Sequence, residues 1–172
     1  MKKAVWSLLI GLVVIVPLVA QPARPTADWK AWQFLIGEWE GEGTGAPGEG
    51  KGGFSLEPDL QGRILVRKNW TDFPAAQGRP AVVHEDVMVI AYEQGGIRAV
   101  YWDNEGHVIH YAVDISPDGA ITFVSPAGPG IPRFRLSYRK IADDRVGIRF
   151  EISSPDKPDE FKVYLDGTAR KK

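Results

Sequence analysis

The chain of 172 residues has no cysteine, which excludes disulfides, thiolate metal sites, thiol nucleophiles and lipid attachment through cysteine. It also lacks an excess of charge, because 21 basic residues balance 22 acidic ones. That balance excludes bulk electrostatic attraction to nucleic acid or to an anionic membrane, so neither is an expected partner. What the chain does have is glycine and proline, 19 and 13 residues, which favour turns and short strands over long helices.

An uncharged apolar run, residues 4–20, follows Lys2 and Lys3. A positive start, an apolar run and small residues at its end are typical of a secretory signal peptide, here cleaved after Ala20. The run is long, so an uncleaved membrane anchor is the alternative; Pro17 favours cleavage because it breaks the helix before the site. We therefore expect a periplasmic or secreted protein with a bacterial style of signal. It would touch a membrane only through an uncleaved N-terminal segment.

Residues 21–27 are predicted to be a proline-rich linker, and residues 28–170 a single domain. Asp28 can cap a short helix whose apolar residues fall on one face. After Gly37 the hydrophobic period becomes two, and turn signals recur about every ten residues, as in consecutive antiparallel hairpins. The predicted strands lie near 38–44, 51–57, 62–73, 82–93, 96–103, 107–115, 119–125, 132–141, 145–153 and 160–170.

A closed barrel explains these ten strands better than an open sheet. An open sheet would leave two edges and one apolar face, with only one short helix to cover it. Closure removes the edges and buries one face, which predicts an all-β, ten-stranded antiparallel up-and-down barrel. In the middle strands both faces carry apolar residues, and His84, Asp86 and Met88 share one face. That mixture indicates a cavity with a few polar groups; a register-switching bulge or an outer face covered by the helix are the alternatives.

Residues 34–43 read FLIGEWEGEG and resemble the opening of the calycin-like barrels. Gly-x-Trp after a short helix is similar to the lipocalins. The fuller Leu-x-Gly-x-Trp-x-Gly-x-Gly pattern resembles nitrobindin-type barrels and related bacterial lipocalin-like domains of unknown function, as do residues 88–106. The resemblance implies a ten-stranded barrel with an internal pocket and with Trp39 plugging one end.

Nitrobindin-like relatives bind haem through a histidine near the end of the domain, whereas this chain has no histidine after His110. We therefore expect no haem and no other cofactor. A metal site is not expected either, because His107 and His110 fall on opposite sides of one strand. Glu38, Glu40 and Glu42 share one strand face, which predicts a charged outer surface, since calcium needs oxygens from a folded loop.

The residues expected to contact a ligand are aromatic or polar members of the central strands. They are Trp70, His84, Met88, Arg98, Trp102, His107 and Tyr111. Lys68 shares a face with Trp70, and Arg98 shares one with Trp102. If that face is the inner one, these cations need an anionic partner; if it is the outer one, they are ordinary surface charges.

The sequence therefore predicts an exported monomer or homodimer that carries or senses a small hydrophobic or planar ligand without covalent chemistry. One alternative is a hydrolase or isomerase that uses His84 with Asp86 as a base. The other is a structural or interaction domain whose interior is solid.

Overall fold

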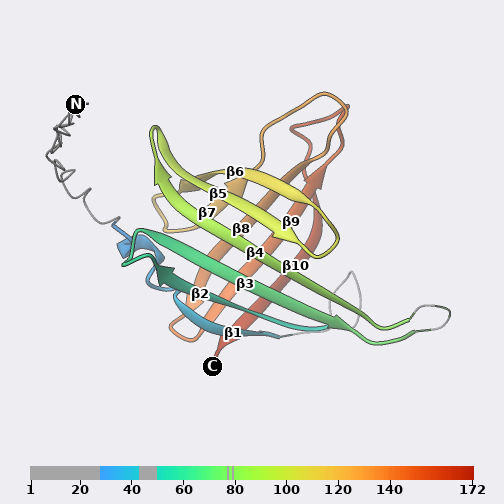
Figure 1. Cartoon of the computed structure of the whole chain (residues 1–172), viewed down its shortest axis with the longest axis horizontal. Coiled ribbons are helices and arrows are strands. Elements are labelled where there is room, and N and C mark those ends of the chain that lie inside the picture. The colour runs from blue at the N-terminus through green and yellow to red at the C-terminus, as the bar shows by residue number, and fades with distance from the viewer. Residues whose placement is uncertain (1–27, 43–49, 77, 79) are drawn as a thin grey trace, which may run out of the picture.

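The computed structural model describes residues 28–42, 50–76, 78 and 80–172, and these form one closed antiparallel sheet (Figure 1). The strands are β1 (Gly37–Glu42), β2 (Lys51–Asp59), β3 (Ile64–Phe73), β4 (Val82–Glu93), β5 (Gly96–Asp103), β6 (Val108–Ile115), β7 (Ile121–Val124), β8 (Arg133–Ala142), β9 (Arg145–Ser153) and β10 (Lys162–Lys171). Each strand pairs with the next along the chain, and β1 pairs with β10. The predicted ten-stranded up-and-down barrel is confirmed, and each predicted bound lies within about two residues of the observed one.

The predicted signal peptide (1–20) and linker (21–27) lie outside the described residues and stay predictions. Within the part of the chain that the structure describes, no helix is long and apolar enough to cross a membrane.

The predicted N-terminal helix is a single 3-10 turn, η1 (Lys30–Trp32), at one end of the barrel (Figure 1). The N-cap is Trp29 and not Asp28 as predicted; Asp28 lies one residue earlier, and its Oδ1 accepts the Lys30 N–H at 3.0 Å. Trp29 Nε1 donates to the carbonyl of Gly62 in the β2–β3 turn, and the Tyr92 hydroxyl donates to the carbonyl of Asp28, both at 2.8 Å. These bonds tie the N-terminal segment across the end of the barrel.

This end of the barrel, which we call the closed end, is filled by large apolar side chains. Trp32, Leu35 and Trp39 are all almost fully buried. Trp39 Nε1 donates to the Leu35 carbonyl at 2.8 Å, and its ring stacks on Phe54 with centroids 5.9 Å apart. Aromatic side chains of this kind each bury about 150–250 Å², so they contribute strongly to the core.

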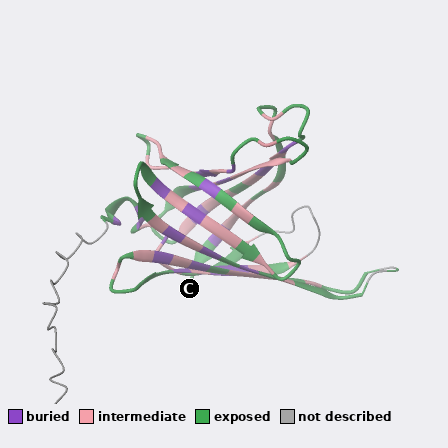
Figure 2. Ribbon diagram, turned by 45° about the horizontal axis from the view of Figure 1, so that its top comes forward, coloured by how far each residue is buried: buried purple, intermediate pink, exposed green. Residues whose placement is uncertain are grey.

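The β3–β4, β5–β6, β7–β8 and β9–β10 connections lie at the opposite end, and the β3–β4 hairpin projects beyond the barrel, away from the others (Figure 2). Towards this end several apolar side chains that face inward are only partly buried, among them Phe134, Ile148 and Phe150. Their partial exposure means that solvent reaches into this half of the lumen. We call it the open half.

Candidate functional site

One wall of the lumen, formed by β3, β4 and β5, carries a buried polar network. The Arg67 Nη1 donates to Asp86 Oδ1 at 2.7 Å, and the Asn69 amide donates to Asp86 Oδ2 at 2.8 Å. The antiparallel register produces this meeting, because it sets Asn69 opposite Asp86 and Arg67 opposite Met88. Arg67 and Asp86 are both buried, and burial of either charge alone would be costly. Each of the two charges therefore needs the other in order to be buried.

The network continues from Asp86 towards the open end through His84. His84 Nε2 lies 3.5 Å from Asp86 Oδ2 and 3.3 Å from the Tyr101 hydroxyl. Its Nδ1 lies 2.9 Å from a carboxylate oxygen of Glu105. Both ring nitrogens thus have partners, and the imidazole is held as a bridge between the rim and the buried carboxylate.

Asp103 anchors the rim end of this wall. The Tyr101 hydroxyl donates to it at 3.1 Å, and the His107 Nδ1 lies 2.8 Å from the same oxygen. Partial burial raises the pKa of Asp103, but the hydrogen bonds from the His107 N–H, the His107 ring and Tyr101 outweigh it, so the net shift is downward. Burial, followed by the charges of Asp86 and Asp103, raises the pKa of Tyr101. Tyr101 therefore stays a protonated donor between two carboxylates.

The facing wall, formed by β8, β9 and β10, is apolar. The Phe134 and Phe150 rings stack with centroids 6.0 Å apart, and Tyr164 meets Phe150 edge-on at 6.0 Å. Gly167 lies opposite Ile148 in the register and shares its inward face. The lumen therefore has a polar side and an apolar side.

At Gly167, on the inward face of β10, an added side chain would have room. A Cβ added there would meet, apart from its chain neighbours and among the described residues, only the Leu165 Cδ2, at 4.0 Å. By contrast, a Cβ at Gly53, which lies on the outer face of β2 opposite Trp70, would lie 2.5 Å from the Trp39 carbonyl oxygen. Gly167 is also partly exposed. Among the described residues, the open half thus leaves space in front of β10 at Gly167.

Three of the residues predicted to contact a ligand face the lumen, and a fourth lies at its rim. Met88 and Tyr111 are buried inside, and His84 belongs to the polar wall. His107 lies at the rim, bonded to Asp103. Among the residues that the structure describes, no group of three or more histidine, aspartate or glutamate side chains is arranged to hold a metal ion.

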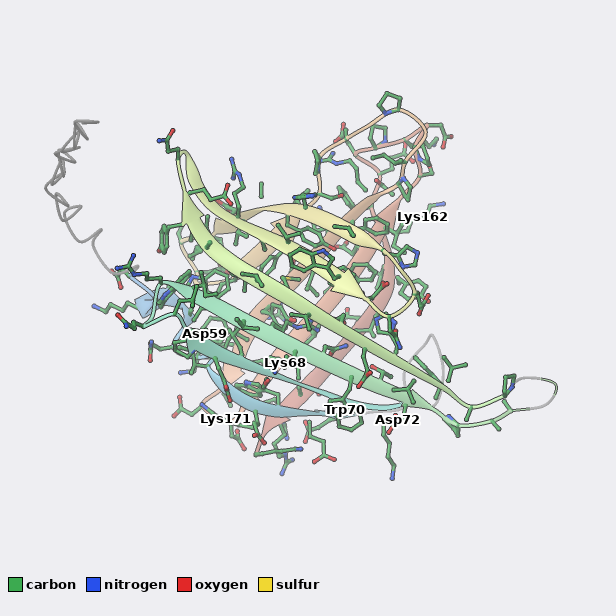
Figure 3. The ribbon with its side chains drawn as sticks, viewed as in Figure 1. Asp59, Lys68, Trp70, Asp72, Lys162 and Lys171 are labelled. Atoms are coloured by element: carbon green, nitrogen blue, oxygen red, sulfur yellow. The ribbon has the colours of Figure 1, made fainter. Side chains whose placement is uncertain are left out.

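The other three, Trp70, Arg98 and Trp102, lie on the outer face. Trp102 stands opposite Val87 in the register and is 43% exposed. With Lys68 it lines a surface depression of about 380 Å³. Figure 3 shows Trp70 directed away from the lumen, on the outer side of the β2–β3 wall. Of the two orientations open for Lys68 and Arg98, the structure has the outer one.

Arg98 lines a second depression, of about 360 Å³, where β7 ends early and leaves the edge of β6 beside the β7–β8 connection. Tyr111, Ser125 and Arg133 line the same depression. Arg98 and Tyr111 are thus brought together, although their side chains belong to opposite faces of the sheet.

The charged row on β1 is on the outside, as predicted. Glu38 and Glu40 are exposed, and Glu42 pairs with Arg170 at 2.7 Å and with Arg145 at 3.0 Å.

Sequence reasoning missed most of the polar wall: Arg67, Asn69, Tyr101 and Asp103. One signal was available. Asp86 shares a face with Met88, and its carboxylate needs a cation as partner if that face is buried. Arg67 and Lys68 are both close enough in sequence to serve, and choosing between them requires the β3–β4 register.

The fold and the site define a closed ten-stranded barrel with an aromatic cluster at one end and a two-sided lumen at the other. No protein-family model matches the chain, and no curated protein matches it.

Proposed function

We propose that this protein is an exported carrier or sensor that binds a small, largely apolar ligand in the open half of its barrel. The unfilled space in front of Gly167 carries the proposal. The ligand's hydrocarbon part would lie against Gly167, Phe134 and Phe150, and its polar part would face the wall of β3–β5. The resemblance of residues 34–43 to lipocalin-like barrels agrees with ligand binding, and the apolar run at residues 4–20 agrees with export.

Covalent catalysis is less well supported than binding. A general base needs a nitrogen that can reach the substrate, whereas both nitrogens of His84 are engaged, by Glu105 on one side and by Tyr101 and Asp86 on the other. The same engagement makes His84 a poor haem ligand. Among the described histidines, His107 is bonded at the rim and His110 lies on the outer face of β6. Titration with haem should therefore give no shift of the Soret band.

A fluorescence titration with N-phenyl-1-naphthylamine, an uncharged apolar probe, tests the binding site. We expect the full-length protein to bind the probe, and Gly167→Leu to weaken binding by at least about tenfold because leucine fills the space. Val163→Leu is the matched control, since Val163 lies on the same strand but is exposed on the outer face. Equal affinity in wild type and Gly167→Leu would contradict lumen binding.

Two further measurements separate binding from its alternatives. Native mass spectrometry of gently purified protein should detect a co-purified small molecule if the protein is a carrier. Loss of turnover in His84→Ala, with binding retained, would instead favour an enzyme.

A further inference from the structure

Two buried hydrogen-bond donors in the lumen have no acceptor in the described part of the chain. They are the Arg67 Nε and the Tyr138 hydroxyl. Arg67 is 8% exposed and Tyr138 is 2% exposed. A buried donor without an acceptor costs about 1–3 kcal/mol, so a pair of them in one lumen calls for a common explanation.

The two donors come from opposite walls of the barrel. Arg67 lies on β3, opposite Met88 in the register. Tyr138 lies on β8, opposite Ile148, which is itself opposite Gly167 on β10. Tyr138 therefore lies in the same cross-strand row as Gly167, two strands away. A ligand in the space at Gly167 would have its inner end beside the Tyr138 hydroxyl.

Both groups are donors at neutral pH. Burial raises the pKa of Tyr138; the Arg67 charge opposes this and Asp86 adds to it, so the phenol stays protonated. Burial by itself would lower the pKa of Arg67, but the charge of Asp86 raises it and the net shift is upward, so the guanidinium keeps its charge. The matching ligand atom is an acceptor.

The charged side chains already in the lumen favour an uncharged acceptor over a negatively charged one. The Arg67 charge is already balanced by Asp86 at 2.7 Å, and Asp103 adds a further carboxylate on the same wall. A ligand carboxylate would bring one more negative charge close to Asp86 in a poorly solvated space, which is unfavourable. An uncharged oxygen meets no such repulsion.

We propose that the Arg67 Nε and the Tyr138 hydroxyl together bind the carbonyl oxygen of an uncharged ketone, ester or amide. Its hydrocarbon part lies against Phe150 and Gly167. This inference rests on the proposed binding function and names the ligand class for the same lumen.

The test compares two uncharged naphthalene probes on the full-length protein: Prodan, which is a ketone, and N-phenyl-1-naphthylamine, which has no carbonyl. Tyr138→Phe removes the hydroxyl and keeps the ring that packs against Phe54 and Phe123. We expect it to weaken Prodan binding about 2- to 10-fold and to shift the emission of bound Prodan to the blue. The affinity for N-phenyl-1-naphthylamine should not change. Tyr92→Phe, which loses a hydroxyl at the closed end, is the control and should alter neither probe.

Three results would overturn the inference. If Tyr138→Phe leaves both the affinity and the emission of Prodan unchanged, the two donors bond water and not the ligand. If 2-naphthoate binds more tightly than Prodan, the selected acceptor is an anion. If wild type binds N-phenyl-1-naphthylamine but not Prodan, lumen binding stands and the carbonyl site does not. Failure of both probes to bind wild type would instead contradict the proposed function itself.

Discussion

The closed end and the open half of this barrel are built from the same strands but differ in how tightly their inward-facing side chains are packed. At the closed end Trp32, Leu35 and Trp39 are almost fully buried, and the Trp39 indole N–H is bonded. In the open half Phe150 and Gly167 are partly exposed. The difference indicates that one end is packed for stability and that the other leaves space for a side chain or a ligand.

The largest expected effect is on the closed end. Trp39→Ala should lower the free energy of unfolding by about 3–5 kcal/mol, because it leaves a cavity beside Phe54. Phe150→Ala should cost only about 1–2 kcal/mol, because part of the ring is already in water. Urea denaturation, monitored by far-ultraviolet circular dichroism and not by tryptophan fluorescence, measures both losses. Equal losses would contradict the division into two regions.

The polar wall should behave as a coupled unit. Asp86→Ala leaves the Arg67 charge buried without its carboxylate and should cost about 3–5 kcal/mol. The double change Arg67→Met with Asp86→Leu should recover most of that loss, because no unpaired charge remains. A double-mutant cycle checks this: the free energies of unfolding of Arg67→Met, Asp86→Leu and the double variant are measured by urea denaturation and compared with wild type. Additive losses would show that the two charges are not coupled.

Two glycines offer a smaller, sharper contrast. Gly167→Ala should stabilise the protein by about 0.5–1 kcal/mol, since an added methyl group has room and glycine is unfavourable in a strand. Gly53→Ala should destabilise it, because the methyl group would lie 2.5 Å from the Trp39 carbonyl oxygen. Thermal unfolding measures both changes. The same sign for both would contradict the claim that a side chain has room at Gly167 and none at Gly53.

The smallest expected effect is on acid stability. The pKa of Asp103 is lowered in the folded state, so its contribution is present above the ordinary value of 3.8 and is lost as pH falls through the lower folded pKa. Asp103→Asn should therefore flatten the fall in urea midpoint below about pH 4. An unchanged acid slope would mean that the rim bonds from His107 and Tyr101 contribute nothing to folding.

The strands were predictable because their signals are local. Turn residues such as Pro117-Asp118-Gly119 mark each connection, and alternation in β8 and β9 assigns each side chain to a face. Closure followed from the lack of any helix able to cover an open sheet. The short helix predicted after Asp28 is a single 3-10 turn, which the burial of Trp29 and Trp32 holds in place.

The site was harder to predict, because it depends on which face of β3 and β5 turns inward. In β3 the apolar residues fall on both faces, so the pattern allows either Arg67 or Lys68 to point inward. Large aromatics suggested the face of Trp70 and Trp102, yet that face is the outer one. The deciding contact, between Arg67 and Asp86, joins two strands and becomes visible only with the register. The alternation of side chains within a single strand does not show which residue of the neighbouring strand each one contacts.

A crystal structure of the full-length protein with N-phenyl-1-naphthylamine tests the central claim most directly. Our account predicts the naphthyl group inside the barrel, against Phe150 and in front of Gly167. Density for the probe in the outer depression beside Trp102, with the lumen free of it, would contradict that account.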